Sequence, residues 1–291
     1  MKRIGRSLIV VFSYCAVAFH TQADTHYVDL AGSHTTPYTS WATAATNIQV
    51  AVNAAVDGDT VHVANGTYLL TSEIVVTEDI LLESVNGPDV TIVDGSGVTL
   101  CFDLEDSACV VSGFTITNGN NSGNSGGGIY CASISPVVTN CVITGNTSYL
   151  GGGMYYGTAN NCTISGNIAD IQGGGMQYGT ANNCTISGNT ADHGGGIRNV
   201  VAYNCVISGN SAIDGSGGGI FSGTAFNCTI VGNTALGSFG GGGIYSGTAN
   251  NCIVWNNTAG TNSNLAGGTQ NHTCSPDVVN GVNGNITNAP A

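Results

Sequence analysis

The stretch Asn161-Cys162-Thr163-Ile164-Ser165-Gly166-Asn167 recurs, with small changes, over more than a hundred residues of the chain. Its copies place a cysteine every 21 to 24 residues, at positions 141, 162, 184, 205, 228, 252 and 274. A fixed period of this length is typical of repeats that bury their apolar residues by stacking on their neighbours. The chain is therefore predicted to fold as a solenoid.

Within the repeat, apolar and polar residues alternate, which indicates a β-strand with one buried face. Cys162 and Ile164 alternate with Thr163 and Ser165, and a Gly-Gly-Gly triplet ends nine residues before the cysteine. In a helix each of those glycines would cost about 1 kcal/mol. The predicted fold class is all-β, a single right-handed parallel β-helix of roughly ten coils whose strands pair about 4.8 Å apart.

The length of the repeat varies only between the asparagine that lies five residues after each cysteine and the next glycine triplet. A segment that absorbs insertions is expected to be a surface loop outside the packed coil. These variable segments are residues 147–150, 168–172, 190–193, 211–216 and 234–240.

Each of six cysteines follows an asparagine, and stacking would place both residues in columns. We predict that these asparagines sit at a buried turn, where their amides hydrogen-bond to one another and to the backbone for about 1 kcal/mol per bond. Because a buried asparagine cannot carry a glycan, the Asn-Cys-Thr match to a glycosylation site is set aside. The predicted structural ladder comprises Asn140, Asn161, Asn183, Asn204, Asn227 and Asn251 with Cys141, Cys162, Cys184, Cys205, Cys228 and Cys252.

Eleven cysteines in an exported chain would normally indicate disulfides. Stacked cysteines, however, hold their Cβ atoms about 4.8 Å apart, whereas a disulfide needs about 3.8 Å. A column of buried free thiols is therefore predicted, and a linear column does not fit tetrahedral zinc. Bridges between Cys101 and Cys109, or between Cys131 and Cys141, are left open.

Residues 1–23 have the parts of a secretory signal: basic residues, an apolar run over 8–19 and a small-residue cleavage site at 21–23. The run is too short to span a bilayer, and no other membrane-spanning segment is expected. The remainder keeps all seventeen acidic residues but only one basic residue, Arg198, so its net charge is near −16. Nucleic acid and anionic membranes are therefore excluded as partners, and a polyanionic ligand would need a bridging cation.

Three regions follow from these patterns. After the signal, residues 24–60 are expected to form a strand, a loop and an amphipathic helix over 47–56, with Thr46 as its N-cap and Gly58 ending it. This helix is predicted to cap the open end of the solenoid, with a binding role as the alternative.

Residues 61–291 are assigned to the β-helix. Its coils are irregular to about residue 125 and regular over 126–275, and the irregular coils carry most of the acidic residues. Residues 273–276 and 284–290 resemble the last-coil region of bacterial β-helix proteins, and this resemblance implies that a further coil, and often an anchor or translocator, would follow.

Two segments resemble known families. Residues 57–68 look like the opening of many pectin-lyase-like β-helix proteins, and residues 186–197 are similar to the repeat of the polymorphic outer-membrane proteins, which are bacterial surface adhesins and autotransporter passengers. Together the resemblances cover nearly all of residues 25–275. They imply a bacterial protein that is secreted or held at the cell surface or outer membrane. The fold hosts lyases, hydrolases, adhesins and phage spikes, so it implies no single activity.

The resemblance also implies that lyases of this fold use acidic Ca²⁺ ligands with an Arg or Lys base, and that its hydrolases use clustered aspartates. The candidate residues here are Asp170, Asp192 and Asp214, on three successive rungs, with His193 and Arg198 nearby. Rung separations of about 5 and 10 Å bracket both retaining and inverting geometries, so the spacing decides nothing. Solvated loop carboxylates are the favoured interpretation, with a Ca²⁺ site and catalysis as alternatives. No catalytic residue is assigned.

A second column follows the glycine triplets and is expected to face outward. Its members are Tyr130, Tyr155, Gln177, Arg198, Phe221 and Tyr245. Stacked aromatic residues can bind sugar rings, and they can equally stabilise a sheet on their own. A third surface, a Thr-x-Ser array of the kind that could order ice, is interrupted at Val206, Val231 and Trp255.

The predicted function is an adhesin-like or carbohydrate-associated binding or structural module. We expect a monomer whose partner is an extracellular polysaccharide or a cell-surface glycan. The alternative is a polysaccharide lyase or glycoside hydrolase that acts on the variable-loop face.

Overall fold

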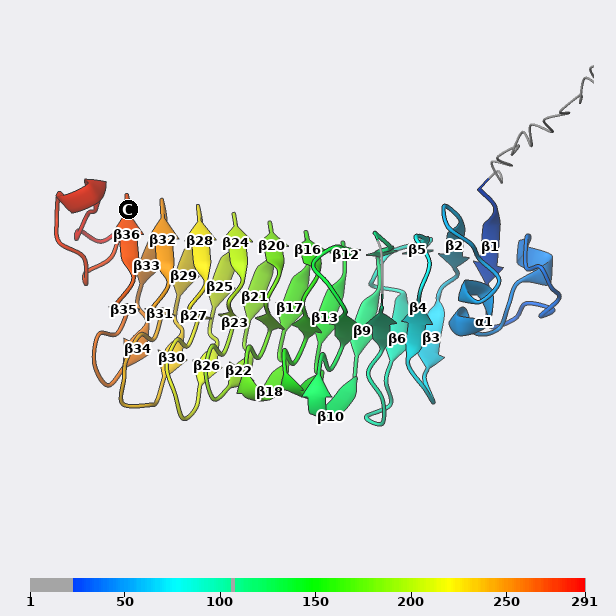
Figure 1. The fold of residues 1–291 in the computed structure, drawn as a ribbon, viewed down its shortest axis with the longest axis horizontal. Coiled ribbons are helices and arrows are strands. Elements are labelled where there is room, and N and C mark those ends of the chain that lie inside the picture. The colour runs from blue at the N-terminus through cyan, green and yellow to red at the C-terminus, as the bar shows by residue number, and fades with distance from the viewer. Residues whose placement is uncertain (1–22, 106–107, 291) are drawn as a thin grey trace, which may run out of the picture.

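The computed structural model describes residues 23–105 and 108–290, so nearly all of the predicted signal segment lies outside it. The described chain forms one elongated parallel β-helix, with its coils stacked along the long axis (Figure 1). Strands pair in parallel with their equivalents one coil away, in four sheets of 11, 9, 7 and 9 strands. The nine-stranded sheets correspond to about nine turns, close to the predicted ten.

We number the sheets in the order in which the chain visits them within one coil. The first sheet contains β1 (Thr25–Val28), β2 (Thr60–Val63), β5 (Leu81–Ser84), β8 (Val110–Ser112), β12 (Val137–Thr139), β16 (Thr158–Asn160), β20 (Thr180–Asn182), β24 (Val201–Tyr203), β28 (Thr224–Phe226), β32 (Thr248–Asn250) and β36 (Thr269–Asn271). The second sheet contains β3 (Gly66–Leu69), β6 (Thr91–Asp94), β9 (Thr115–Thr117), β13 (Val142–Thr144), β17 (Thr163–Ser165), β21 (Thr185–Ser187), β25 (Val206–Ser208), β29 (Thr229–Val231) and β33 (Ile253–Trp255).

The other two sheets lie on either side of the glycine triplets. The third sheet contains β10 (Asn120–Ser125), β14 (Thr147–Leu150), β18 (Ile168–Gln172), β22 (Thr190–Ala191), β26 (Ser211–Ala212), β30 (Thr234–Ala235) and β34 (Thr258–Ala259). The fourth sheet contains β4 (Ile74–Val76), β7 (Phe102–Leu104), β11 (Ile129–Cys131), β15 (Met154–Tyr155), β19 (Met176–Gln177), β23 (Ile197–Arg198), β27 (Ile220–Phe221), β31 (Ile244–Tyr245) and β35 (Leu265–Ala266).

The third sheet corrects the prediction that the variable segments are loops. Residues that follow each buried asparagine continue as strands, because a small side chain such as Ala169 or Ala191 packs inward there. Extra residues are accommodated after the strand, as in Ile213–Ser216, which lies between β26 and the next triplet. Each variable segment therefore begins as a strand of the coil, and only the residues after that strand form a loop.

The prediction that the asparagines before the cysteines are buried is wrong. Asn161 and Asn183 are exposed, in a left-handed backbone conformation with φ of 52° and 54°. They do stack, since the Asn183 amide donates to Asn161 Oδ1 at 3.3 Å. The left-handed turn at Asn161 directs its side chain to solvent, whereas Cys162, the next residue, is buried. The burial argument against glycosylation at Asn161 therefore does not hold.

The buried ladder is formed instead by the asparagines that lie five residues after the cysteines. Asn189 is representative: its Nδ2 donates to Ile164 O and to Asn210 Oδ1, both at 2.9 Å. Its Oδ1 accepts from the backbone N–H and the Nδ2 of Asn167, at 2.9 and 3.0 Å. From Asn167 to Asn257, each side-chain amide in the column therefore uses both of its hydrogens and both of its lone pairs inside the protein. The column comprises Asn146, Asn167, Asn189, Asn210, Asn233, Asn257 and Asn264.

The glycine triplets are required by this ladder. In the triplet at residues 173–175, Gly173 has a φ of +67°, which favours glycine. A Cβ on Gly174 would lie 2.4 Å from Thr190 O, and a Cβ on Gly175 would lie 3.0 Å from Asn189 Nδ2. The chain can therefore approach the buried amides only where side chains are absent.

The cysteines that directly follow the exposed asparagines form a second buried column. Cys184 N–H donates to Cys205 Sγ at 3.4 Å, and Cys184 Sγ donates to Ala159 O at 3.5 Å. All ten described cysteines are free thiols, so the bridges left open between Cys101 and Cys109 and between Cys131 and Cys141 are absent from the described structure. Burial raises the pKa of Cys101 to about 12, as expected for an inert thiol in an apolar core.

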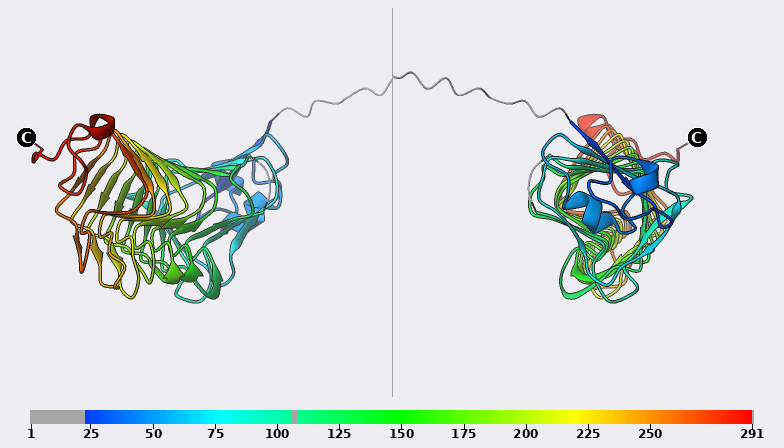
Figure 2. Two further views of the ribbon diagram at one scale, coloured as in Figure 1. Left: turned by 60° about the vertical axis from the view of Figure 1, so that its left-hand side comes forward. Right: turned by 90° about the vertical axis from the view of Figure 1, so that its right-hand side faces the viewer.

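A short helix lies over the N-terminal end of the solenoid (Figure 2). Helix α1 spans Ile48–Val52 with Asn47 as N-cap, and is shorter than the predicted helix over 47–56 capped by Thr46. Beyond the end of the helix, the Asp59 carboxylate accepts from Val56 N–H at 2.9 Å, so this N–H is not used for a helical hydrogen bond. Gln49 pairs with the N–H and C=O of Val75 on β4, an edge strand of the fourth sheet, and thereby satisfies polar groups that would otherwise be unpaired.

Two 3₁₀ turns complete the described elements, η1 (Trp41–Thr43) and η2 (Val282–Gly284). Near η2, Asp277 Oδ2 accepts from the backbone N–H groups of Asn264 and Leu265, at 2.8 and 3.0 Å. The asparagine column therefore ends on a carboxylate. No helix in the described part of the chain is long and apolar enough to cross a membrane.

Replacing a buried ladder amide should destabilise the protein far more than the same change at the exposed turn. Asn189→Asp removes both Nδ2 donors and leaves buried acceptors unpaired. This should lower the free energy of unfolding by about 3 to 5 kcal/mol in total. Asn183→Asp should cost less than about 1 kcal/mol, because aspartate tolerates the exposed left-handed turn. Thermal unfolding of both variants measures the difference. Equal shifts in melting temperature would contradict the assigned ladder.

Candidate functional site

The outward residues of the fourth sheet form one continuous row along the solenoid. Strands β7, β11, β15, β19, β23, β27 and β31 pair in register, so each contributes one member. In order, the row is Asp103, Tyr130, Tyr155, Gln177, Arg198, Phe221 and Tyr245. The structure thus places all six residues of the predicted ligand-binding column in one row and adds Asp103 at one end. Gln177, however, is only 1% exposed, so the prediction that this residue faces solvent is wrong.

Neighbouring side chains in the row contact one another. The rings of Tyr130 and Tyr155 stack with centroids 5.7 Å apart at an interplanar angle of 6°. In the amide orientation that satisfies both of its ends, Gln177 accepts from Arg198 Nη1 at 3.2 Å. The guanidinium carbon of Arg198 lies 5.5 Å from the centroid of Phe221, which is a cation–π distance. The row is therefore an ordered surface rather than a set of independent side chains.

Two tyrosines that were not predicted flank this row. Tyr156 and Tyr178 stack on each other with centroids 4.9 Å apart, and both contact the edge or face of Tyr155. Strand alternation would place Tyr156 inside the coil, but a left-handed conformation at φ 60° brings it beside Tyr155. The sequence signal was the glycine that follows each tyrosine, which marks a turn.

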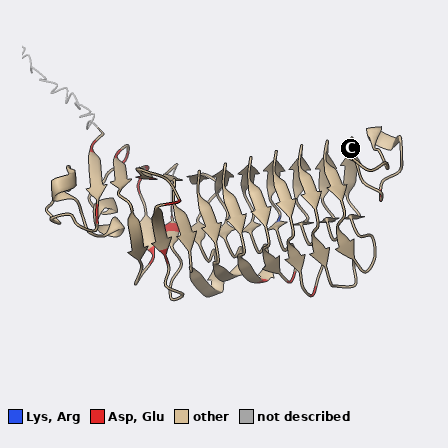
Figure 3. Cartoon of the chain, turned by 180° about the vertical axis from the view of Figure 1, so that it is seen from behind, with Lys and Arg blue, Asp and Glu red and all other residues tan. Residues whose placement is uncertain are grey.

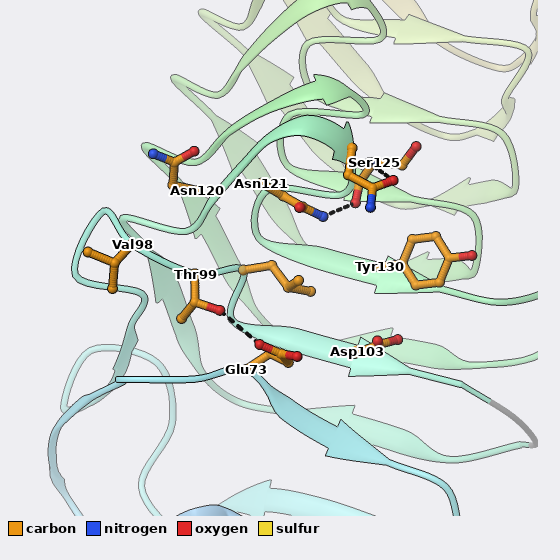
Figure 4. A pocket seen from close by; sticks show the side chains of 10 residues that line it. Glu73, Val98, Thr99, Asp103, Asn120, Asn121, Ser125 and Tyr130 are labelled. Atoms are coloured by element: carbon orange, nitrogen blue, oxygen red, sulfur yellow. Dashed lines mark hydrogen bonds between the residues drawn. The ribbon is translucent and has the colours of Figure 1, made fainter.

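A pocket of about 500 Å³ opens at the Asp103 end of the row (Figure 4). Its floor is the face of the fourth sheet, with Asp103 and Tyr130, and one wall is strand β10 with Asn121 and Ser125. Glu73, just before β4, points into it. The repeat gave no signal for this pocket, because β4, β7 and β10 belong to the irregular coils.

The pocket is acidic and no basic residue lines it. Asp103 Oδ1 is enclosed and has no hydrogen-bond partner among the described residues. Burial raises the pKa of Asp103 to about 6, and the nearby carboxylates of Glu105 and Glu73 add to the shift. Glu73 Oε2 accepts from Thr99 Oγ1 at 3.0 Å, so this carboxylate is only partly satisfied. The pocket therefore presents carboxylate oxygens that accept few hydrogen bonds from the protein.

The three aspartates of the variable segments lie elsewhere, along the third sheet. Asp170 and Asp214 are exposed, and Asp192 is half-buried. Burial and the carboxylate of Asp214 raise the pKa of Asp192. Within residues 23–105 and 108–290, no group of three or more His, Cys, Asp and Glu side chains could hold a metal ion. No ligand cluster of this kind therefore supports the Ca²⁺ alternative at these aspartates, and the favoured interpretation as solvated carboxylates stays a prediction.

The two remaining candidates from the sequence are His193, which packs against the row, and Arg198, which is a member of the row. The ring of His193 contacts Phe221 edge to face, with centroids 5.2 Å apart, and its Nδ1 accepts from Ser216 N–H at 3.4 Å. Arg198 makes no ion pair with a carboxylate in the described part of the chain. Neither residue meets the aspartates in a catalytic arrangement.

These features define the class: a parallel β-helix with an outward aromatic and polar row that ends in an acidic pocket. Residues 105–259, more than half of the chain, match the family described as the right handed beta helix region, and the chain belongs to that family. The predicted fold and handedness are thereby confirmed. No curated protein matches the chain.

Solved structures show the same architecture at low sequence identity. Pectate lyase Pel9A is 15% identical with a TM-score of 0.59, covering 87% of this chain and 74% of that one. Pectin methylesterase from Aspergillus niger is 14% identical with a TM-score of 0.45, covering 93% and 92%. A rhamnogalacturonan lyase is 16% identical with a TM-score of 0.37, covering 85% and 62%. At these identities the similarity establishes the fold alone.

The raised pKa of Asp103 predicts a specific pH dependence of stability. Asp103 keeps its proton up to about pH 6 in the folded state, whereas an unperturbed Asp carboxyl, whose pKa is 3.8, loses it at lower pH. The ionised side chain therefore destabilises the fold above pH 6. Asp103→Asn should therefore raise stability at pH 8 by about 1 kcal/mol, after discounting for solvent screening, and by close to nothing at pH 4.

Melting temperatures at the two pH values test this expectation. The control is Asp89→Asn, an exposed position that should show no such gain. A lower melting temperature for Asp103→Asn at pH 8 would contradict the interpretation, because it would mean that the carboxylate has a stabilising partner.

Proposed function

We propose that this protein is an exported glycan-binding module that holds a polysaccharide along the outward row of the fourth sheet. The observation that carries the proposal is the continuity of the row from Asp103 to Tyr245, with a sugar-sized pocket at one end. Clefts of this size with a few convergent polar groups are typical ligand sites.

The stacking geometry determines which parts of the rings can meet a ligand. The nearly parallel rings of Tyr130 and Tyr155 cover each other's faces. On its other side, the strand neighbour of Tyr130 is the smaller Asp103 rather than an aromatic residue, and both side chains line the pocket, so a sugar ring in the pocket can contact Tyr130. Elsewhere the row offers ring edges, tyrosine hydroxyls and the Arg198 guanidinium, which suit sugar hydroxyls, whereas the Gln177 amide is buried.

The solenoid also lowers the cost of binding. Row residues sit on short strands paired on both sides, so their backbone is already ordered before a ligand arrives. Successive coils are about 4.8 Å apart, which gives an extended polymer one contact per coil.

Export and surface display belong to the same proposal. The signal-like residues 1–23 and the similarity of residues 186–197 to the polymorphic outer-membrane repeat support a bacterial protein that is secreted or attached to the cell surface. In that setting the partner would be an extracellular polysaccharide or a cell-surface glycan, and an adhesin-like role follows.

The alternative of a lyase or hydrolase on the variable-loop face has less support. Asp170, Asp192 and Asp214 do not converge, and no Lys or Arg lines the pocket that could act as a lyase base. Incubation with a panel of neutral, acidic and amino glycans should therefore release neither new reducing ends nor unsaturated products.

Binding to the same panel tests the proposal directly. Tyr155→Ala breaks the stack at its centre and should weaken glycan affinity about tenfold, equivalent to about 1.4 kcal/mol. The matched control is Tyr203→Ala, because Tyr203 stacks on Phe226 at 5.0 Å in the first sheet, away from the row. Calorimetry measures the glycan affinity of both variants. Equal loss in the two variants, or no glycan bound by the native protein, would contradict the proposal.

A further inference from the structure

The charge of the pocket suggests which glycans it can accept. Glu73 and Asp103 line it, Glu105 lies close enough to raise the pKa of Asp103, and no basic side chain offsets them. Acidic residues gather on the irregular N-terminal coils that surround this site (Figure 3). The local potential therefore attracts cations and repels uronates or sulfated sugars.

Hydrogen bonding gives the same indication independently of net charge. Asp103 Oδ1 is enclosed without a donor, and Glu73 receives one hydrogen bond, from Thr99. Desolvation disfavours the ionised form of Asp103, and a ligand rich in N–H groups that contacts the part of this side chain facing the pocket would offset that cost. An ammonium group has three donors and a positive charge, and its bonds to carboxylates are short and strong.

The size of the pocket suits a sugar ring better than a bare ion. Its volume of about 500 Å³ is many times that of an ion, and the described residues contain no group of three His, Cys, Asp and Glu ligands. Tyr130 forms one side. A sugar ring against Tyr130 would place an exocyclic substituent toward the carboxylates on the same floor.

We propose that this pocket recognises a protonated amino sugar, so that the ligand class is a glycan with free amino groups. The inference rests on the proposed glycan binding and specifies its chemistry. The amine donates to Asp103 and Glu73, the sugar ring packs on Tyr130, and the next sugar of the chain extends toward Tyr155. N-acetylation removes both the charge and two of the three donors, so it abolishes recognition at this position.

The test compares two oligosaccharides that differ only in acetylation: a β-1,4-linked glucosamine tetramer and the same tetramer fully N-acetylated, both at pH 6.5. We expect calorimetry to show at least about tenfold tighter binding of the amino form. Asp103→Asn should remove this preference, and Glu73→Gln should reduce it. Asp89→Asn changes the net charge equally at an exposed site and should retain the preference.

The outcomes separate this inference from the function on which it rests. If the two tetramers bind the native protein equally well and Tyr155→Ala weakens both, glycan binding stands and the amino-sugar inference is overturned. If the preference falls equally in Asp103→Asn and Asp89→Asn, it reflects general attraction to an acidic protein, and the pocket has no role. If neither tetramer nor any other glycan binds, both proposals fail.

Discussion

The buried asparagine column is the interaction on which the rest of the fold depends. From Asn167 to Asn257 its amides use every donor and acceptor within the protein, so each of these coils is fixed to the next by hydrogen bonds that water cannot replace. This arrangement requires glycine at the facing turn, where a Cβ would meet the amide or a carbonyl oxygen. Because the fourth-sheet strand begins directly after that turn, the column also sets the register of the outward row.

The regular coils carry the stabilising repeat, and the acidic pocket lies toward the irregular N-terminal coils. The regular coils supply repeated asparagine, cysteine and glycine positions, and their aromatic rings stack in register. Toward the N-terminus the repeat is lost, β10 is six residues long, and Asp103 occupies the position that Tyr130 holds one coil later. A pocket forms where the irregular coil meets the regular row, so the acidic groups can be clustered there although they destabilise the ionised state.

The sequence predicted the repeat, the β-helix and the outward row, because these depend on periodic positions that stacking turns into columns. It did not identify which asparagine column is buried, since Asn161 and Asn167 recur with the same period and differ only in backbone conformation. The pocket was missed for a different reason. Glu73 and Asp103 are thirty residues apart in coils without a repeat, and their importance comes from burial and mutual repulsion that sequence spacing does not reveal.

The central claim is that the fixed outward row and its terminal pocket form the ligand site. A crystal structure of the protein with a glucosamine oligomer measures this most directly. The account predicts a terminal sugar against Tyr130, its amine within hydrogen-bond distance of Asp103, and the chain running toward Tyr155. Ordered sugars on the first sheet around Tyr203, or along Asp170 and Asp192 on the third sheet, would contradict it.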